Sequence, residues 1–179
     1  MQHNSIDSGG TRPGSERGAS VVEFAIILPL LIMLLFGIIT GGQAYNLNNS
    51  LNNAARESAR YAATLPVDAN MTIYLNSVAD VARTSATGAM DPSAPGQRIC
   101  VAYVYPDGSA SDDRTTRLIE TSGARVIDVG TPCISDGRPS DERRVQVAVQ
   151  RDSELEAVLY SQTLHLDASS VARYERIDI

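Results

Sequence analysis

The segment RGASVVEFAIILPLLIMLLFGIITGG, residues 17–42, is by far the most apolar part of the chain. Residues 24–42 contain no charged side chain, and as a helix they would extend about 28 Å at 1.5 Å per residue. The hydrocarbon core of a bilayer is about 30 Å thick, whereas the apolar run of a buried soluble helix is usually about 10 to 14 residues long. The stretch therefore predicts a membrane-spanning helix.

A single acidic residue, Glu23, lies immediately before this apolar run. A carboxylate at the rim of a bilayer carries a desolvation cost, and ionisable groups in such positions usually have a partner. One interpretation needs no partner. Glu23 would lie at the headgroup level in the first turn of the helix, where the helix dipole favours a negative charge.

Two processing schemes are compatible with the apolar segment. A secretory signal peptide would be cut after the run, and Gly42-Gln43-Ala44 offers a small-x-small site, but the apolar core of such a peptide is normally about 7 to 15 residues. The second scheme cuts before the run and retains the helix, leaving residues 1–18 with Arg12 and Arg17 in the cytoplasm. The arginines on either side of the run do not by themselves fix the orientation.

The residues around Glu23 also carry a family resemblance. Gly18-Ala19-Ser20-Val21-Val22-Glu23-Phe24, followed by the apolar run, resembles the type III leader of pilins and pseudopilins. The blocks LPLL at 28–31, LFGII at 35–39 and NNAARESARYAA at 52–63 are similar to the TadE-like family of Tad pilus pseudopilins. Together these motifs cover about residues 17–64, roughly a quarter of the chain.

The resemblance implies that a prepilin peptidase cuts between Gly18 and Ala19, so that Glu23 becomes the fifth residue of the mature chain. The new ammonium group of Ala19 would then neutralise the carboxylate of Glu23, in the same or a neighbouring subunit, where either charge alone is costly. Phe24 stands where the major pilins of this branch favour tyrosine, which fits a minor pseudopilin. Other pilins and pseudopilins and the Tad membrane assembly proteins are the further implied partners.

The rest of the chain predicts an α+β, pilin-like fold. Small or apolar residues continue at helical spacing after the apolar run. This extension either lies on the head as in the pilin layout or is a solvated juxtamembrane helix that covers its own domain, and both alternatives predict burial of Leu47 and Leu51. Leu65-Pro66 is expected to end the helix. Asp68 or Asn70 would cap a short second helix. The apolar stripe expected on that helix is Met71, Tyr74, Leu75, Val78, Val81 and Ala82. The expected division is a leader at 1–18, a transmembrane helix with an amphipathic extension at 19–64, and an extracytoplasmic head at 65–179.

Alternating apolar residues predict a small antiparallel sheet in the head. Residues 99–104, 145–149 and 163–174 are expected to be strands, with a short pairing around 125–129, giving three or four strands in all. The polar segment 109–117 is expected to be a loop, and the segment 153–160 is expected to be a helical turn or a loop.

The two cysteines, Cys100 and Cys133, predict a structural disulfide. They lack the CxxC spacing of a zinc or thioredoxin-like site, and export of the head would place them in an oxidising compartment. Two free buried thiols are the alternative. Closing the 33-residue span would stabilise the fold by about 3 to 4 kcal/mol in the chain-entropy model.

The sequence offers no catalytic site, cofactor site or metal site. His165, Asp167 and Ser169 alternate along the last predicted strand and would share one face of it. Leu164 and Leu166 are expected to point to the opposite, buried face, so the row is expected to be solvated. There is no HExxH, Walker-type glycine loop or GxSxG motif, and the acidic pairs Asp112-Asp113 and Asp141-Glu142 lack EF-hand spacing. A net charge of -6 without a basic cluster argues against nucleic-acid binding.

The expected function is that of a non-enzymatic TadE-like minor pseudopilin of a Tad/Flp-type adhesion pilus, held in the bacterial cytoplasmic membrane with its head outside. Two alternatives remain. The first is a single-pass anchored extracytoplasmic binding domain that does not polymerise, and the second is a soluble protein secreted after cleavage behind Ala44.

Overall fold

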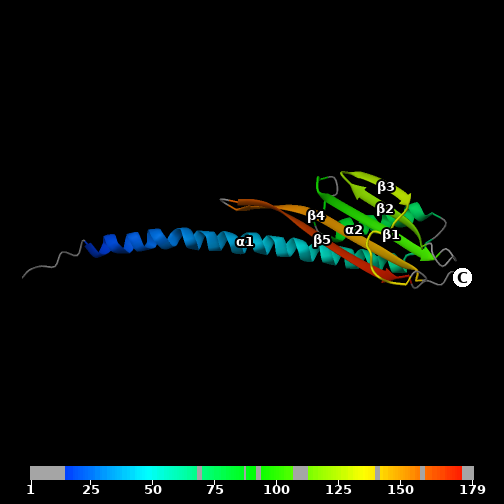
Figure 1. The fold of residues 1–179 in the computed structure, drawn as a ribbon, viewed down its shortest axis with the longest axis horizontal. Coiled ribbons are helices and arrows are strands. Elements are labelled where there is room, and N and C mark those ends of the chain that lie inside the picture. Colours follow the sequence, from blue (N-terminus) through cyan, green and yellow to red (C-terminus); the bar gives the residue numbers. More distant parts are fainter. Residues whose placement is uncertain are drawn as a thin grey trace, which may run out of the picture. The chain divides into compact units, whose positions relative to one another are not determined.

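A computed structural model describes residues 15–67, 70–86, 88–91, 94–106, 113–139, 142–157 and 160–174. It contains two helices and five strands, α1 and α2 followed by β1 to β5 (Figure 1), which confirms the predicted α+β class. The chain divides into two compact units, Met1–Thr40 and Gly41–Ile179. The predicted leader up to residue 14, the alternative cap Asp68 and residues 109–112 of the predicted loop lie outside the described residues.

Helix α1, Ser15–Thr64, contains the apolar run. Its part from Gly18 onward is long and apolar enough to cross a membrane, by length and composition, and the most apolar stretch is not buried within the protein. Pro29 lies inside the helix. The helix ends directly before Leu65-Pro66, as predicted, with a last backbone hydrogen bond of 3.1 Å from Leu65 N–H to the Tyr61 carbonyl oxygen.

Helix α2, Met71–Ser85, is capped by Asn70, whose side-chain oxygen accepts a hydrogen bond of 3.3 Å from Ile73 N–H. Its buried residues are Tyr74, Leu75, Val78, Ala79 and Ala82. The predicted stripe is thus confirmed at Tyr74, Leu75, Val78 and Ala82. Met71 is half-buried at the margin of the core and Val81 is half-buried, while the contact face includes Ala79 instead.

The sheet has five strands in the order β3-β2-β1-β4-β5, and every neighbouring pair is antiparallel. Their bounds are Gln97–Pro106 for β1, Asp113–Thr121 for β2, Ala124–Val129 for β3, Arg144–Ala157 for β4 and Tyr160–Arg173 for β5. The prediction of three or four strands was therefore one or two strands short.

Two predicted loops are in fact strand. Residues 113–117 open β2, and the segment 153–160 belongs to β4 up to Ala157 and to β5 from Tyr160. The first segment, DRTTR, contains no apolar residue. In the second, SELEAVLY, the alternation gives way to an unbroken apolar run at 157–160, so periodicity did not reveal either strand. Their backbone groups instead pair with a neighbouring strand, which only the tertiary fold supplies. The first segment pairs with β1, and in the second segment the end of β4 pairs with the start of β5.

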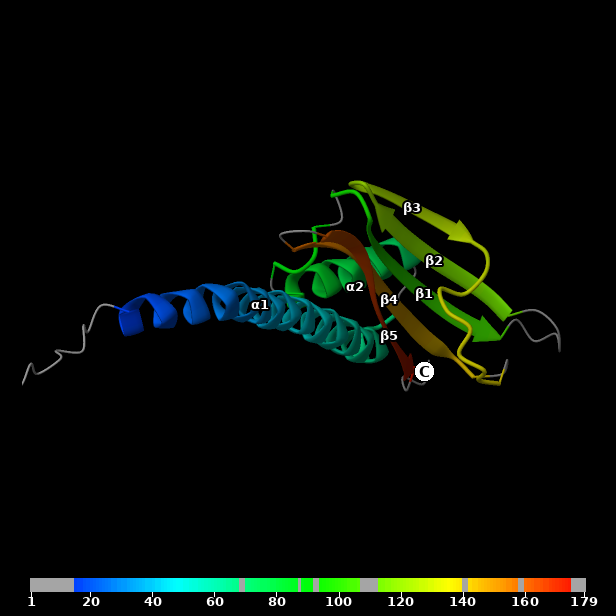
Figure 2. The same cartoon turned by 60° about the vertical axis from the view of Figure 1, so that its left-hand side comes forward.

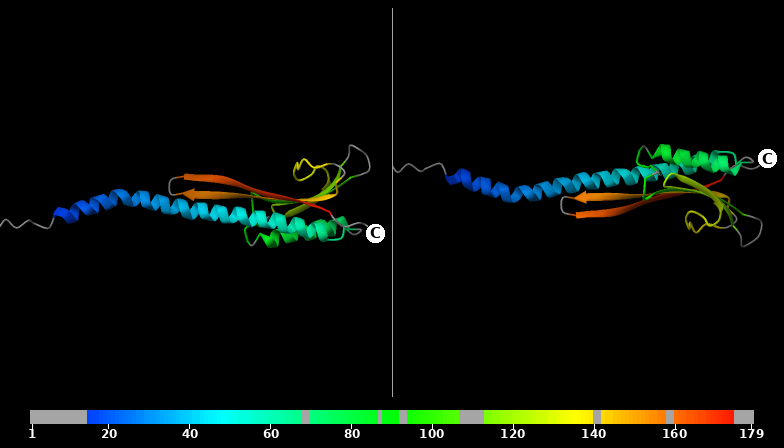
Figure 3. Two further views of the ribbon diagram at one scale, coloured as in Figure 1. Left: turned by 90° about the horizontal axis from the view of Figure 1, so that it is seen from below. Right: turned by 90° about the horizontal axis from the view of Figure 1, so that it is seen from above.

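One face of the sheet and the two helices form the core of the second unit, with α2 and the adjoining part of α1 on the same side (Figures 2 and 3). The sheet contributes Ile99, Val101, Tyr103, Leu118, Val145, Val147, Val149, Leu166 and Ala168. From α1 come Leu51, Ala54, Ala55, Ala59 and Ala62. Leu51 is fully buried as predicted, whereas Leu47 is half-buried and packs at the margin of this core.

A tyrosine cluster holds the end of α1 to this core. Tyr103 packs edge-on against Tyr74 and Tyr174, with ring centroids 5.8 and 5.4 Å apart. Burial raises the pKa of Tyr74, whose hydroxyl donates a 2.8 Å hydrogen bond to the Ala62 carbonyl oxygen. The Tyr174 hydroxyl donates to the Leu65 carbonyl oxygen at 3.1 Å and accepts from Val67 N–H at 3.0 Å. The helix end is therefore bound by side chains from α2 and from the end of β5.

Candidate functional site

The predicted processing and assembly residues all lie near the start of α1. Gly18 and Ala19 are exposed, and a Cβ atom added at Gly18 would meet no other atom within 4 Å. The bond between them lies only three residues after the helix begins at Ser15. Few backbone hydrogen bonds hold a helix terminus, so this bond can be presented to a peptidase at little cost in folding.

Glu23 lies four residues beyond Ala19, which is one helical turn or about 6 Å along the axis. It is exposed and has no hydrogen bond or ion pair with any residue that the structure describes. Phe24 follows it and is 58% exposed. The carboxylate and aromatic ring at the edge of the apolar run are therefore unoccupied within the chain and free for contacts outside it.

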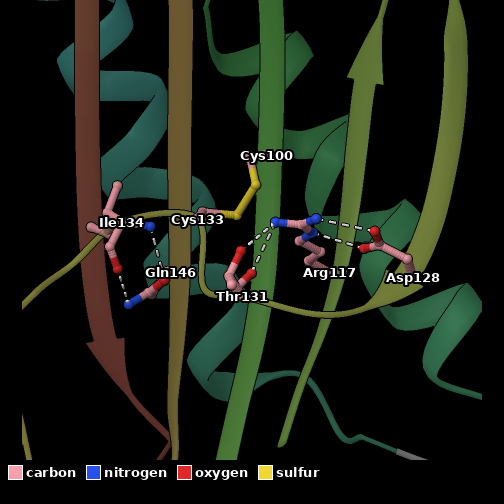
Figure 4. The surroundings of a disulfide bond; sticks show 7 residues. All are labelled: Cys100, Arg117, Asp128, Thr131, Cys133, Ile134 and Gln146. Carbon is pink, nitrogen blue, oxygen red and sulfur yellow. Dashed lines mark hydrogen bonds and ion pairs between the residues drawn. A yellow bond between two sulfur atoms is a disulfide. The ribbon is translucent and has the colours of Figure 1, made fainter. Parts of the chain in front are cut away.

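The cysteines form the predicted disulfide. Cys100 on β1 is bonded to Cys133 in the connection between β3 and β4, with the Cα atoms 5.9 Å apart (Figure 4). The connection, residues 130–139, crosses the face of the sheet opposite the helices, and we call it the strap (Figures 3 and 4). The alternative of two free thiols is wrong, since both cysteines are in this bond. The bond ties the strap to the central strand, β1.

Gln146 on β4 anchors the strap beside the disulfide. This fully buried amide accepts from Ile134 N–H at 3.3 Å and donates to the Ile134 carbonyl oxygen at 3.0 Å (Figure 4). It also donates at 2.8 Å to the carboxylate of Asp136, which accepts a second 2.8 Å bond from Arg144 Nε. Burial would raise the pKa of Asp136, but hydrogen bonds from Gln146, the Arg138 backbone and Arg144 outweigh it and lower the pKa below its usual value.

Arg117 on β2 fixes the beginning of the strap. Its guanidinium group binds the Asp128 carboxylate in a bidentate pair at 2.7 and 3.1 Å and donates to the Thr131 hydroxyl and carbonyl oxygens at 2.8 and 3.1 Å (Figure 4). The hydrogen bond to Asp128 raises the pKa of Arg117, and the same bond lowers that of Asp128. Sequence reasoning missed Arg117, Gln146 and Asp136, because no local motif marks residues that meet only across strands.

The lowered pKa values of Asp136 and Asp128 predict loss of stability in acid. A carboxyl whose folded pKa is depressed stabilises the fold above its unfolded pKa of about 3.9, and that contribution is lost as the pH falls through the lower folded value. We expect Asp136→Asn to cost about 2 kcal/mol at pH 7, since hydrogen bonds to charged groups contribute roughly that much, and to flatten the acid limb of the stability profile. Urea unfolding of the full chain in detergent at pH 2.5 to 7 measures both effects. Asp167→Asn, at an exposed carboxyl, should leave the profile unchanged.

His165, Asp167 and Ser169 point to the face away from the helices and are exposed, as predicted for a solvated row. His165 Nδ1 lies 2.6 Å from Asp152 Oδ1, and its side chain is 78% exposed. Ser169 is four residues from His165 on the same strand, about 13 Å away at 3.3 Å per residue, so the row cannot act as a catalytic triad. Among the described residues no group of three or more His, Cys, Asp or Glu side chains could hold a metal ion, and Asp112 and Asp141 lie outside that part of the chain.

The chain thus combines one long apolar helix, which fits a single-pass membrane anchor, with an α+β head that contains a disulfide. Residues 18–60 match the family model described as TadE-like protein, which confirms the resemblance predicted for this segment. Neither the curated proteins nor the solved structures include a match to the chain. The family match supports a pilus-associated structural component with membrane association and with pilins or assembly proteins as partners.

Proposed function

We propose that this protein is a minor pseudopilin of a Tad/Flp-type adhesion pilus. A prepilin peptidase cleaves it between Gly18 and Ala19, α1 then holds it in the cytoplasmic membrane, and the head lies outside the cytoplasm. The observation that carries the proposal is the position of Glu23, one helical turn after Ala19 and directly before the apolar run, inside the segment that matches the TadE-like model.

Cleavage supplies the partner that Glu23 lacks in the uncleaved chain. Before cleavage the Ala19 nitrogen is a neutral amide, and afterwards it is an ammonium group at the lipid boundary. A charge in that setting is costly alone and much less costly when it is paired, so each new N-terminus favours a position beside a Glu23 carboxylate. In this way peptidase action is coupled to assembly through one new positive charge.

The exposed faces of α1 suit packing against other helices. Added Cβ atoms at Gly37, Gly41 and Gly42 would meet no other atom within 4 Å, so these positions leave open surface on the single chain. Small residues allow two membrane helices to approach closely, which is how such helices associate where the hydrophobic effect is absent. The proposed partners of this surface are the apolar helices of other pilins and pseudopilins.

N-terminal sequencing of the membrane-bound protein, expressed with and without a prepilin peptidase, tests the processing step. We expect the mature chain to begin at Ala19 only when the peptidase is present. Gly18→Leu should remain uncleaved, because the peptidase is expected to require the small residue, while Gly37→Leu, the same change within the helix, should be cleaved normally. A start at Met1 or Gln2 would support an anchored domain that does not polymerise, and a start at Tyr45 a secreted soluble protein.

A further inference from the structure

Strands β4 and β5 continue past the rest of the sheet. The pairing of β1 with β4 ends at Gln97 and Arg151, whereas β4 and β5 remain paired as far as Ala157 and Tyr160 (Figure 1). We call residues 152–157 and 160–165 the hairpin arm. Among the described residues its two strands have only each other as strand neighbours. Two-stranded hairpins are marginally stable in water, so an arm of this kind gains stability from a further contact.

The base of the arm presents an acidic face on the side away from the helices. Asp152 and Glu154 alternate along β4, and Asp167 lies on β5 two residues beyond His165, the cross-strand partner of Asp152. All three carboxylates are exposed, and we call them the acidic face. Asp152 pairs with His165, whereas Glu154 and Asp167 have no partner among the described residues. Asp152 and Asp167 line a shallow depression of about 400 Å³, and Arg98 and His165 line the same depression.

A second depression of about 510 Å³ lies between α1 and the end of α2. It is lined by Asn53, Arg56, Glu57, Arg60 and Ser85, and we call it the arginine groove. Arg56 and Arg60 are exposed and have no hydrogen-bond or ion-pair partner among the described residues. In a chain with a net charge of -6, two neighbouring unpaired arginines favour an acidic ligand.

The two surfaces match in charge and in spacing. Arg56 and Arg60 are one turn apart on a helix, about 6 Å along its axis, while Asp152 and Glu154 are two residues apart on a strand, about 6.8 Å. We propose that the hairpin arm of one copy of this chain docks its acidic face on the arginine groove of a second copy. The contact uses only residues of the second unit, so it is independent of cleavage at Gly18 and of Glu23.

The contact joins two different patches, so each pair of copies still has one free arm and one free groove. Such a heterologous contact can continue from copy to copy instead of closing as a dimer. Exposed ion pairs are individually weak, but they set orientation and partner choice, and confinement of the copies to one membrane raises their effective concentration.

Sedimentation of the full chain in detergent, over a range of protein and salt concentrations, tests the contact. Arg56→Glu with Arg60→Glu replaces attractions by repulsions, and we expect self-association to weaken about tenfold. Asp152→Arg with Glu154→Arg reverses the two carboxylates whose spacing matches that of the arginines and should weaken association equally. Mixing the two double variants should restore wild-type association, because each acidic surface then again faces a basic one. Arg56→Gln with Arg60→Gln should give an intermediate value.

Arg173→Glu is the matched control, since Arg173 is an exposed arginine without a partner among the described residues and lies in neither surface. It should associate like the wild type, and higher salt should weaken association of the wild type. The proposal is overturned if the double variants associate as well as the wild type, if their mixture associates no better than either alone, or if Arg173→Glu is equally weakened.

Discussion

Glu23→Gln is expected to be cleaved normally and anchored in the membrane but to be incorporated into pilus assemblies at least tenfold less than the wild type. Glutamine keeps the shape and most hydrogen-bonding groups of glutamate and removes only the charge. The ammonium group created at Ala19 would then enter a poorly hydrated helix bundle without its partner. An unpaired charge in such a setting costs several kcal/mol, far more than the remaining hydrogen bonds return.

Quantification of the variant in sheared pilus fractions against the membrane fraction measures this effect. Asp80→Asn removes an exposed carboxylate from α2, outside α1 and outside both proposed docking surfaces, and should be incorporated normally because exposed ion pairs contribute little. Normal incorporation of Glu23→Gln would contradict the proposed charge pairing even if cleavage at Ala19 is observed. The pairing and the processing step are thus tested separately.

Removal of the disulfide is expected to lower the free energy of unfolding by about 3 to 4 kcal/mol, as chain entropy predicts for a closed loop of this length. Cys100→Ala with Cys133→Ala is the suitable variant, because Cys100 is buried and alanine leaves no unsatisfied polar group there. The bond holds the strap across the central strand, so its loss opens a closed loop of 33 residues in the unfolded chain and loosens the strap in the folded one. Urea unfolding of the full chain in detergent measures the difference.

Reduction of the wild type should produce a similar loss, whereas the alanine double variant should not respond to reductant. Asp136→Asn offers an internal comparison, since it weakens the strap through the buried Asp136, Arg144 and Gln146 network while leaving the disulfide in place. Because both changes act on the strap, their combined effect should be smaller than the sum of the two. Equal stability of the oxidised protein and the double variant would show that the disulfide does not stabilise the head.

Local patterns were sufficient for the helices and for the inner strands. The apolar run predicted α1, Leu65-Pro66 its end and Asn70 the cap of α2, because each of these depends on residues within one or two turns. The alternating valines of β4 predicted its inner half in the same way. The outer half of β4, the start of β5 and the start of β2 were assigned to loops, because their strand structure depends on a partner strand distant in sequence.

The proposed processing and assembly residues Gly18, Ala19, Glu23 and Phe24 lie close together along the chain, so they could be proposed from the sequence alone, and they stay a prediction. The contacts of the strap were not. Cys133 could be paired with Cys100 only because the chain contains two cysteines, and nothing in the sequence indicated that Gln146 would bind Ile134 and Asp136.

The sequence by itself therefore determined the apolar helix, its acidic residue and its end, because hydrophobic length and nearest-neighbour chemistry act along the chain. Only the tertiary structure decided the five-strand order, the strap, the hairpin arm and the placing of Arg56 and Arg60 beside the end of α2. These features arise where distant segments meet. The polar and charged groups that hold them in place do not come together until the sheet has formed.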